Sequence, residues 1–193
     1  MPWEKTFDVE QTLNRAMQAF WAHGYEATSM QDLVACTGVN RASLYATYGD
    51  KRELFIAALR LFDREQRKAR LDDLEQRFAP RAAIAAFFRG FVRHAAGKDD
   101  RRGCFLTNTA LELASHDAEV GRIVADSQAD IEAFFRRLLK KGQAAGEFSA
   151  ALDSKRAARG LLASLLGLLV LARSRPQPAL LDDVVGDALD RLA

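Results

Sequence analysis

The chain has 193 residues, of which 49% are hydrophobic, and this is enough material for one or two folded domains with a buried core. A formal net charge of +2 at pH 7 is nearly neutral, so any affinity for nucleic acid must come from the local placement of charges. The only cysteines, Cys36 and Cys104, lie far apart and outside any zinc-binding spacing, which excludes a disulfide framework and a zinc finger and fits a reducing cytoplasm.

Neither a secretion signal nor a membrane span is expected. The segment from Met1 to Asp8 lacks the basic region and the apolar stretch of a signal peptide. The longest apolar run, Leu161 to Ala172, is interrupted by Ser164 and is too short to cross a bilayer. We therefore expect a cytoplasmic protein that does not contact a membrane.

Helical periodicity dominates the sequence. Proline occurs only at positions 2, 80, 176 and 178, alternating segments rich in Val, Ile and Thr are absent, and apolar residues recur at helical spacing. This pattern predicts an all-α fold. About nine helices are expected, over residues 8–23, 29–37, 40–48, 50–77, 80–96, 104–114, 117–145, 153–173 and 179–192. The fourth is strongly charged in its second half, as a connector between two lobes would be.

The second and third predicted helices form a helix-turn-helix pattern. Ser29 and Asn40 are placed to cap them, and Gly38 lies in the tight turn that joins them. The second helix of such a pair fits the DNA major groove, which is about 12 Å wide. Leu44 and Tyr48 share the inward face of this reading helix. The residues left for the DNA side are Arg41, Ala42, Ser43, Tyr45 and Thr47.

These side chains suit distinct DNA contacts. The guanidinium of Arg41 can pair with guanine O6 and N7, and Ala42 can touch a thymine methyl group. Ser43 and Thr47 can bond to bases or phosphates, whereas Tyr45 is better suited to a phosphate.

Phosphate contacts are also expected at two helix starts. Lys51 opens the fourth helix, and the second helix begins at Ser29. Residues 1–52 hold five Lys and Arg against six Asp and Glu, so Ser29 and Gln31 must supply contacts that basic residues would otherwise make. The acidic balance of residues 1–39 keeps open an alternative, a helical ligand carrier or small enzyme that merely retains the N-terminal fold.

A longer pattern extends from Phe7 to Leu59. It consists of Phe20, Gly24-Tyr25, Ala27-Thr28-Ser29, Leu33, Gly38-Val39, Ser43-Leu44-Tyr45, Tyr48, Lys51 and Leu54-Phe55. This pattern closely resembles the DNA-binding domain of the TetR family of repressors. The resemblance implies an all-helical homodimer that binds a palindromic operator and releases it when a small effector enters the C-terminal domain. It implies a helix-turn-helix domain at residues 1–52 and an effector-binding and dimerisation domain at 53–193.

The middle helices carry aromatic residues with a few polar groups, which is the composition of a ligand pocket and equally that of a plain core. With the resemblance, they become the expected effector pocket, for an apolar or weakly cationic ligand. Cys104 follows a basic loop at a helix start, where a thiol can be reactive, but we expect it to act as a small buried hydrophobe. The expected pocket residues are Phe87, Phe88, Phe91, Cys104, Phe105, Asn108, Glu112 and Phe134.

The last two helices are expected to pair two chains, because the eighth carries leucines around nearly its whole circumference. The expected interface residues are Leu161, Leu165, Leu168, Leu169, Val184 and Leu189. No cofactor, metal site or catalytic motif is expected. Glu112 and His116 have a spacing that two metal ligands could share, but without a third ligand they are better read as a surface pair.

Overall fold

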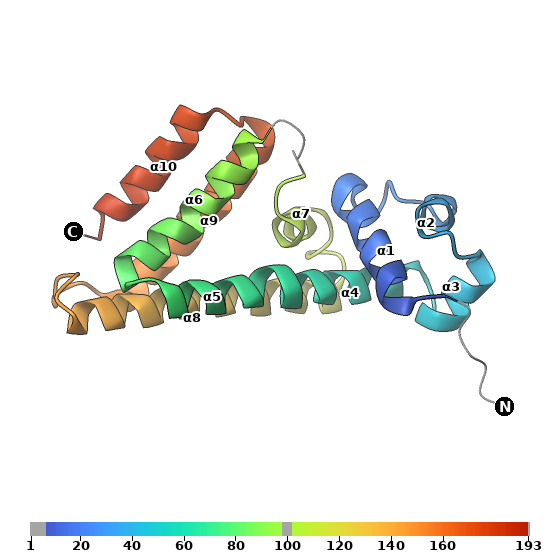
Figure 1. Cartoon of the computed structure of the whole chain (residues 1–193), viewed down its shortest axis with the longest axis horizontal. Helices are drawn as coiled ribbons and strands as arrows, with labels where there is room; N and C mark the ends of the chain where they lie inside the picture. Colours follow the sequence, from blue (N-terminus) through green and yellow to red (C-terminus); the bar gives the residue numbers. More distant parts are fainter. Residues whose placement is uncertain (1–6, 98–101, 193) are drawn as a thin grey trace.

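The computed structural model describes residues 7–97 and 102–192, and the regular secondary structure within them is entirely helical (Figure 1). The helices are α1 (Val9–His23), α2 (Met30–Thr37), α3 (Arg41–Tyr48), α4 (Lys51–Phe62), the π-helical turn η1 (Asp63–Lys68), α5 (Ala69–Arg77), α6 (Pro80–Ala96), α7 (Phe105–Glu112), α8 (Ala118–Ala144), α9 (Ser154–Ser174) and α10 (Pro178–Asp190). Since α4, η1 and α5 follow one another without a break, this part of the chain contains nine separate helices. The prediction of an all-α fold is confirmed.

Side-chain caps fix where the N-terminal helices begin. Asp8, Asn40 and Asp50 each accept a hydrogen bond from the backbone N–H three residues later, at 2.8–3.0 Å. Ser29 forms a full capping box with Asp32 at the start of α2. Gly38 ends α2 with a φ of 74°, a left-handed conformation that favours glycine. These local signals produce the two short helices and the tight turn between them.

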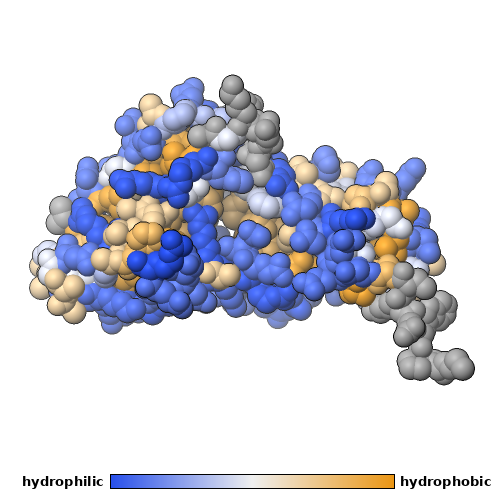
Figure 2. All heavy atoms as spheres, in the orientation of Figure 1, coloured by the Kyte–Doolittle hydropathy of each residue, from blue (hydrophilic) through white to orange (hydrophobic). Residues whose placement is uncertain are grey.

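The molecule is elongated, with α1, α2 and α3 together at one end (Figure 1). The continuous helix formed by α4, η1 and α5 runs from this end along the length of the chain, and α6, α9 and α10 lie at the other end. In the space-filling view, the edge along this long helix is mostly hydrophilic (Figure 2), which fits the many charged residues after Phe62. One helix therefore connects the two ends of the protein.

The smaller of two hydrophobic cores joins the N-terminal helices to α7 and α8. Phe20, Leu33 and Leu44 meet Phe55 of α4 in this core, and Phe105 of α7 packs into it. The rings of Phe55 and Phe105 are edge to face, with centroids 5.5 Å apart. This core therefore includes residues on both sides of position 52.

The larger core is formed by α5, α6, α8, α9 and α10. Phe87 and Phe88 of α6 contact Phe134 and Phe135 of α8, with ring centroids 5.6–5.8 Å apart. Within the described residues, α9 is the one helix long and apolar enough to cross a membrane, and one face of it packs into this core. The buried leucines of α9 thus serve the interior of a single chain.

Candidate nucleic-acid interface and internal cavity

The helix α3 is held against α1 by its inward side chains. Leu44 is 1% exposed, and the hydroxyl of Tyr48 donates a hydrogen bond to the carbonyl oxygen of Val9 at 3.0 Å. Burial raises the pKa of Tyr48, so the hydroxyl stays protonated and able to donate. The opposite face of α3 is turned away from the rest of the chain.

The outward face of α3 is led by Arg41 and Ala42, which are exposed. Ser43, Tyr45 and Thr47 are half-buried. Arg41 Nη2 donates to the Tyr45 hydroxyl at 3.0 Å, and its guanidinium lies 5.3 Å from the centroid of that ring. Because Tyr45 accepts this bond, its own proton remains available for a further partner.

One exposed residue of this face, Ala46, was absent from the predicted reading set. Like Ala42, it has a small apolar side chain that could approach a thymine methyl group, and its exposure on this face is apparent only from the structure.

The start of α2 is less open than the sequence suggested. The Ser29 hydroxyl donates to Asp32 Oδ2 at 2.6 Å and accepts from the Asp32 N–H at 3.1 Å, so it is occupied as a cap. The hydrogen bonds that the hydroxyl and the backbone N–H of Ser29 donate to its carboxylate lower the pKa of Asp32, which therefore remains charged. Gln31 is exposed beside it. A phosphate approaching this terminus would meet a carboxylate as well as free N–H groups.

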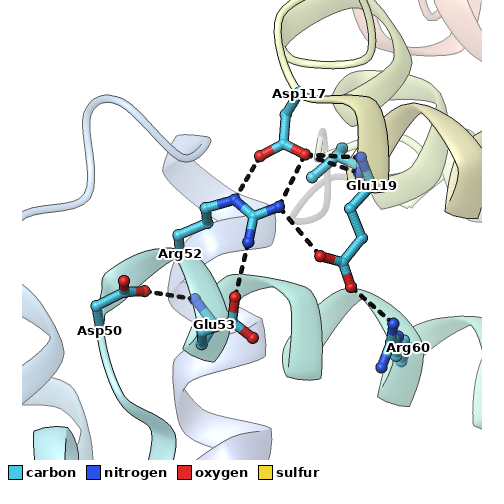
Figure 3. A network of polar contacts seen from close by, with 7 residues as sticks. Asp50, Arg52, Glu53, Arg60, Asp117 and Glu119 are labelled. Atoms are coloured by element: carbon cyan, nitrogen blue, oxygen red, sulfur yellow. Dashed lines mark hydrogen bonds and ion pairs between the residues drawn. The ribbon is translucent and has the colours of Figure 1, made fainter.

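Lys51 and Arg52 are adjacent cations with different surroundings. Lys51 Nζ lies 4.3 Å from the ring centroid of Tyr25 and has no ion pair among the described residues. Arg52 instead turns toward α8, where its Nε donates to Asp117 Oδ2 at 2.6 Å and its Nη2 reaches Glu119 at 3.1 Å (Figure 3). Lys51 is thus available to an external anion, whereas Arg52 is satisfied internally.

The Arg52 network ties the helix-turn-helix unit to the rest of the chain (Figure 3). Asp117 accepts both from Arg52 and from the N–H groups of Glu119 and Val120, so it also caps α8. Arg52 holds the pKa of Asp117 well below its ordinary value. Glu119 continues the network to Arg60 of α4 at 2.9 Å. The start of α4 and the start of α8 are therefore joined by four charged side chains.

A second connection runs through Glu112, which was predicted to line the effector pocket. Its carboxylate accepts hydrogen bonds from the backbone N–H of Tyr25 at 3.2 Å and of Glu26 at 3.0 Å. Trp21 Nε1 donates to the Gly103 carbonyl at 3.0 Å in the same region. The pocket assignment of Glu112 is corrected, because its charge is used to hold the loop after α1 against α7.

A cavity of about 240 Å³ lies between the long helix, α6, α7, α8 and α9. Of the predicted pocket residues, Phe87, Phe91 and Cys104 line it. Its wall consists of Trp21, Phe62, Gln66, Arg67, Arg70, Phe87, Gly90, Phe91, His94, Ala95, Gly103, Cys104, Leu106, Thr107, Val124, Ser127, Gln128, Ile131, Leu165, Leu166, Leu169 and Ala172. Among the described residues, no Asp or Glu contributes to this wall, and its arginines are Arg67 and Arg70.

The other predicted pocket residues lie elsewhere. Phe88 and Phe134 are fully buried in the larger core and do not reach the cavity. Phe105 and Asn108 border a separate hollow between α1 and α7 instead. The composition of these helices could not distinguish aromatic residues of the core from those of the cavity wall. Arg67 and Arg70 were not predicted to line the cavity, because they lie in a strongly charged segment that is typical of a solvent-exposed helix face.

Cys104 is the N-cap residue of α7 and packs against both cores. Burial raises the pKa of its thiol, and the N–H groups of Leu106 and Thr107 offset this only in part. The thiol is therefore protonated near neutral pH. Arg101, a basic residue of the loop before Cys104, lies outside the described residues.

The leucines predicted for a chain-pairing interface require correction. Leu161, Leu165, Leu168 and Leu169 are at most 6% exposed within one chain, so they form its own core. Val184 and Leu189 are half-buried against the same core. The exposed face of α9 is formed by other residues, which are Gly160, Ala163, Gly167, Val170 and Ser174.

Within residues 7–97 and 102–192, no three His, Cys, Asp or Glu side chains come together as metal ligands. Glu112, half of the metal-ligand spacing in the sequence, is engaged by two backbone N–H groups.

Comparison with family models connects both regions to known proteins. The model for bacterial regulatory proteins of the tetR family matches residues 13–58, which include α2 and α3. The model for the C-terminal domain of tetracyclin repressor-like proteins matches residues 80–186, which include most of the cavity wall.

Two relatives match over almost the whole chain. The chain is 33% identical to the HTH-type transcriptional regulator YezE of Bacillus subtilis (strain 168), and the match covers 97% of each protein. It is 31% identical to the HTH-type transcriptional repressor ComR of Escherichia coli (strain K12), over 96% of this chain and 89% of ComR.

Solved structures agree with these matches. The chain superposes with a TM-score of 0.86 on a cysteine mutant of the TetR family transcriptional regulator CifR complexed with a 26-base-pair double-strand operator DNA, at 28% identity over 98% of this chain and 99% of that one. A TetR transcriptional regulator from Chloroflexus aurantiacus shares the fold with a TM-score of 0.83, at 24% identity over 94% and 91% of the two chains.

Proposed function

This chain belongs to the TetR family of DNA-binding transcriptional regulators, and we propose that it is a homodimeric repressor that releases a palindromic operator when a small molecule enters the cavity. One observation carries the proposal. The helix that begins with Lys51, beside the reading helix, continues without a break to Arg67 and Arg70 in the cavity wall. Support also comes from ComR, which is named a repressor, and from the operator DNA bound to CifR.

Base reading is assigned to the outward face of α3. Arg41 would contact guanine through its remaining guanidinium N–H groups while the Tyr45 hydroxyl accepts one hydrogen bond from Nη2 and so orients the side chain. Ala42 and Ala46 are small enough to let the helix approach base edges and thymine methyl groups closely. Ser43 and Thr47, on the flanks, suit bases or phosphates. We keep residues 1–52 as the DNA-binding domain in this scheme.

Phosphate contacts are assigned to Lys51, Gln31 and the Tyr45 hydroxyl. Lys51 is the strongest of these, because its ammonium lies over the Tyr25 ring and forms no ion pair among the described residues. Gln31 adds a neutral contact near the start of α2, where Asp32 makes the local field less favourable. Ser29 acts mainly as a cap. We expect modest affinity for nonspecific DNA as a result.

Dimerisation is assigned to the exposed faces of α9 and α10. Val170 is 42% exposed, and extra side-chain atoms at Gly160 and Gly167 would meet nothing within 4 Å, so a second helix can approach closely there. A two-fold axis would present both reading helices to one side of the duplex, with half-sites about one helical turn apart or a multiple of it.

The dimer is tested by light scattering on purified protein. Val170→Arg should produce a folded monomer, whereas Leu111→Arg, a matched change at an apolar residue that is 74% exposed elsewhere, should leave the dimer intact. If the unmodified protein is monomeric at micromolar concentration, the proposed dimer is contradicted.

Effector release is assigned to the long helix. A molecule in the cavity would contact Phe62, Gln66 and Arg67, and would thereby bias the position of the helix that carries Lys51. The Arg52 and Asp117 contact is where the helix-turn-helix unit would move relative to α8. A change in separation of the two reading helices prevents both from occupying successive major grooves.

The proposal is tested by selecting genomic fragments that bind the purified protein at moderate salt, followed by titration of a 26-base-pair duplex, the length bound to CifR. We expect saturable binding that Arg41→Ala weakens by roughly 1–3 kcal/mol on the preferred sequence and that Lys155→Ala, a charge change on α9, does not affect. Failure to select any promoter fragment would favour the alternative, a helical ligand carrier or small enzyme. As a regulator of chromosomal genes, the protein would act in the cytoplasm.

A further inference from the structure

The cavity wall contains an arginine with an unused donor group. Arg67 of η1 is 7% exposed, and its Nε and Nη2 donate to Asp63, the latter at 2.8 Å. Nη2 also donates to Asp130 at 3.0 Å. Nη1 is buried and has no hydrogen-bond partner among the described groups. Buried donors are normally satisfied, so Nη1 is a donor positioned for an acceptor that the chain itself does not supply.

A second arginine follows one turn later on the same wall. The guanidinium of Arg70 lies 4.4 Å from the ring centroid of Phe91 and 5.3 Å from that of Phe87, and its Nη2 donates to the Phe87 carbonyl at 3.1 Å. No carboxylate pairs with it within the described residues. Burial lowers the pKa of Arg70, and the nearby charge of Arg93 lowers it further. The cavity therefore holds a partly desolvated cation without a counter-charge.

Gly90 of α6 makes this position of Arg70 possible. A Cβ atom at residue 90 would lie 1.7 Å from Arg70 Nη2, which no side chain could tolerate without moving the guanidinium. The glycine lies inside a helix, where it lowers helix stability relative to alanine. Its presence fits a helix surface shaped to receive the arginine head group.

The rest of the wall is predominantly apolar, and the described residues contribute no Asp or Glu to it. Trp21, Phe62, Leu106, Val124 and Ile131 line it together with α9 leucines. A volume of about 240 Å³ is below the roughly 300–1,000 Å³ typical of pockets for drug-sized ligands, so the occupant is small. These features oppose a cationic ligand, which the sequence had left open.

We propose that the effector is a small carboxylic acid with an apolar body, whose carboxylate is bound by Arg67 and Arg70. A carboxylate accepts charge-assisted hydrogen bonds from guanidinium groups and supplies the counter-charge that Arg70 lacks. The inference rests on the proposed function in taking this cavity as the effector site. It adds the chemical class of the effector and the two residues that select it.

Direct binding is measured by calorimetry with the full-length protein. The probes are the straight-chain carboxylates from propionate to octanoate, together with benzoate. Each carboxylate is compared with the primary amide and the primary amine that have the same carbon skeleton. The preferred carboxylate should bind at least about tenfold more tightly than its amide, since a charge-assisted hydrogen bond is about twice as strong as a neutral one. The matching amine should not bind detectably.

Three variants assign the effect to the arginines. Arg70→Met should remove the preference for carboxylate over amide, and it leaves no buried carboxylate unpaired. Arg67→Lys should reduce the preference while keeping a cation beside Asp63. Arg64→Met, on the same turn but with a side chain that is 67% exposed, is the matched control and should bind as the parent does. Circular dichroism establishes that each variant is folded.

The inference is overturned if no carboxylate of the series binds below millimolar concentration, if an amide or amine binds as tightly as its acid, or if Arg70→Met retains the parent's preference. Operator binding is titrated in parallel, so that the two ideas fail separately. A protein that binds promoter DNA but prefers amides refutes the carboxylate effector alone. A protein that binds a carboxylate but no promoter fragment refutes the repressor function alone.

Discussion

Replacing Lys51 by alanine should weaken binding to every DNA sequence to a similar extent and make that binding less sensitive to salt. Lys51 lies over the Tyr25 ring and has no ion pair among the described residues, so its charge is available to a backbone phosphate. Arg41→Ala should differ in kind. It should cost roughly 1–3 kcal/mol on the preferred operator and flatten discrimination at one base pair of each half-site.

The expected size of the Lys51 effect follows from the two-fold arrangement. A dimer carries two copies of Lys51, and each phosphate contact contributes about 0.9 to the slope of log K against log salt concentration. Lys51→Ala should therefore make the slope shallower by about 1.8. Between about 50 and 200 mM salt, a fourfold change, the variant should lose about 12-fold less affinity than the parent does.

The assay is operator affinity by fluorescence anisotropy across a salt series, with single-base operator variants at one salt concentration. Lys155→Ala, which removes one charge at the start of α9, controls for net charge. An unchanged salt slope in Lys51→Ala would refute its assignment as a phosphate clamp. An unchanged base preference in Arg41→Ala would refute α3 as the reading helix.

Three further changes have defined outcomes. Tyr45→Phe removes the acceptor that orients Arg41, so it should cost about 0.5–1.5 kcal/mol on the operator and less in the Arg41→Ala background; additive losses in anisotropy titrations would contradict this coupling. The ion pair lowers the pKa of Asp117, so its stabilisation of the fold is complete above the ordinary carboxyl pKa of 3.8 and is lost as the pH falls from there through the lowered pKa. Asp117→Asn should therefore flatten the acid side of a plot of Tm against pH. Arg70→Met should leave Tm unchanged or raise it, because it replaces a desolvated unpaired cation with an apolar side chain; a marked loss of Tm would show that Arg70 is a structural residue.

The helices and the outward face of α3 could be predicted because their signals are local. Ser29, Asn40 and Asp50 cap helices through bonds that span three residues, and the spacing of Leu44 and Tyr48 identifies the inward face of α3. None of these features depends on the rest of the chain. The sequence therefore placed the helix-turn-helix correctly before any tertiary contact was known.

The cavity wall and the outer face of α9 could not be predicted in the same way, because they depend on which helices meet. Leucines surround α9, and only the packed structure reveals that Leu165 and Leu169 face inward while Gly167 and Val170 face outward. Arg67 looked like one more charge in a solvated run. Its burial requires Asp130, which is 63 residues away.

The proposed coupling between the cavity and the outward face of α3 rests on how unevenly the long helix is held. At its start, Arg52 forms an ion pair with Glu119, and the two side chains are 38% and 30% exposed. Such exposed ion pairs are weak because water competes for both charges. Near its middle, Arg67 is buried with Asp63 and lacks one partner. In the proposed mechanism, a ligand that satisfies Arg67 acts on the part of the long helix that lines the cavity, and the exposed ion pairs at the start of that helix are the contacts that change. Coupling free energies of about 1–3 kcal/mol are sufficient for a regulator, and they need no disruption of either core.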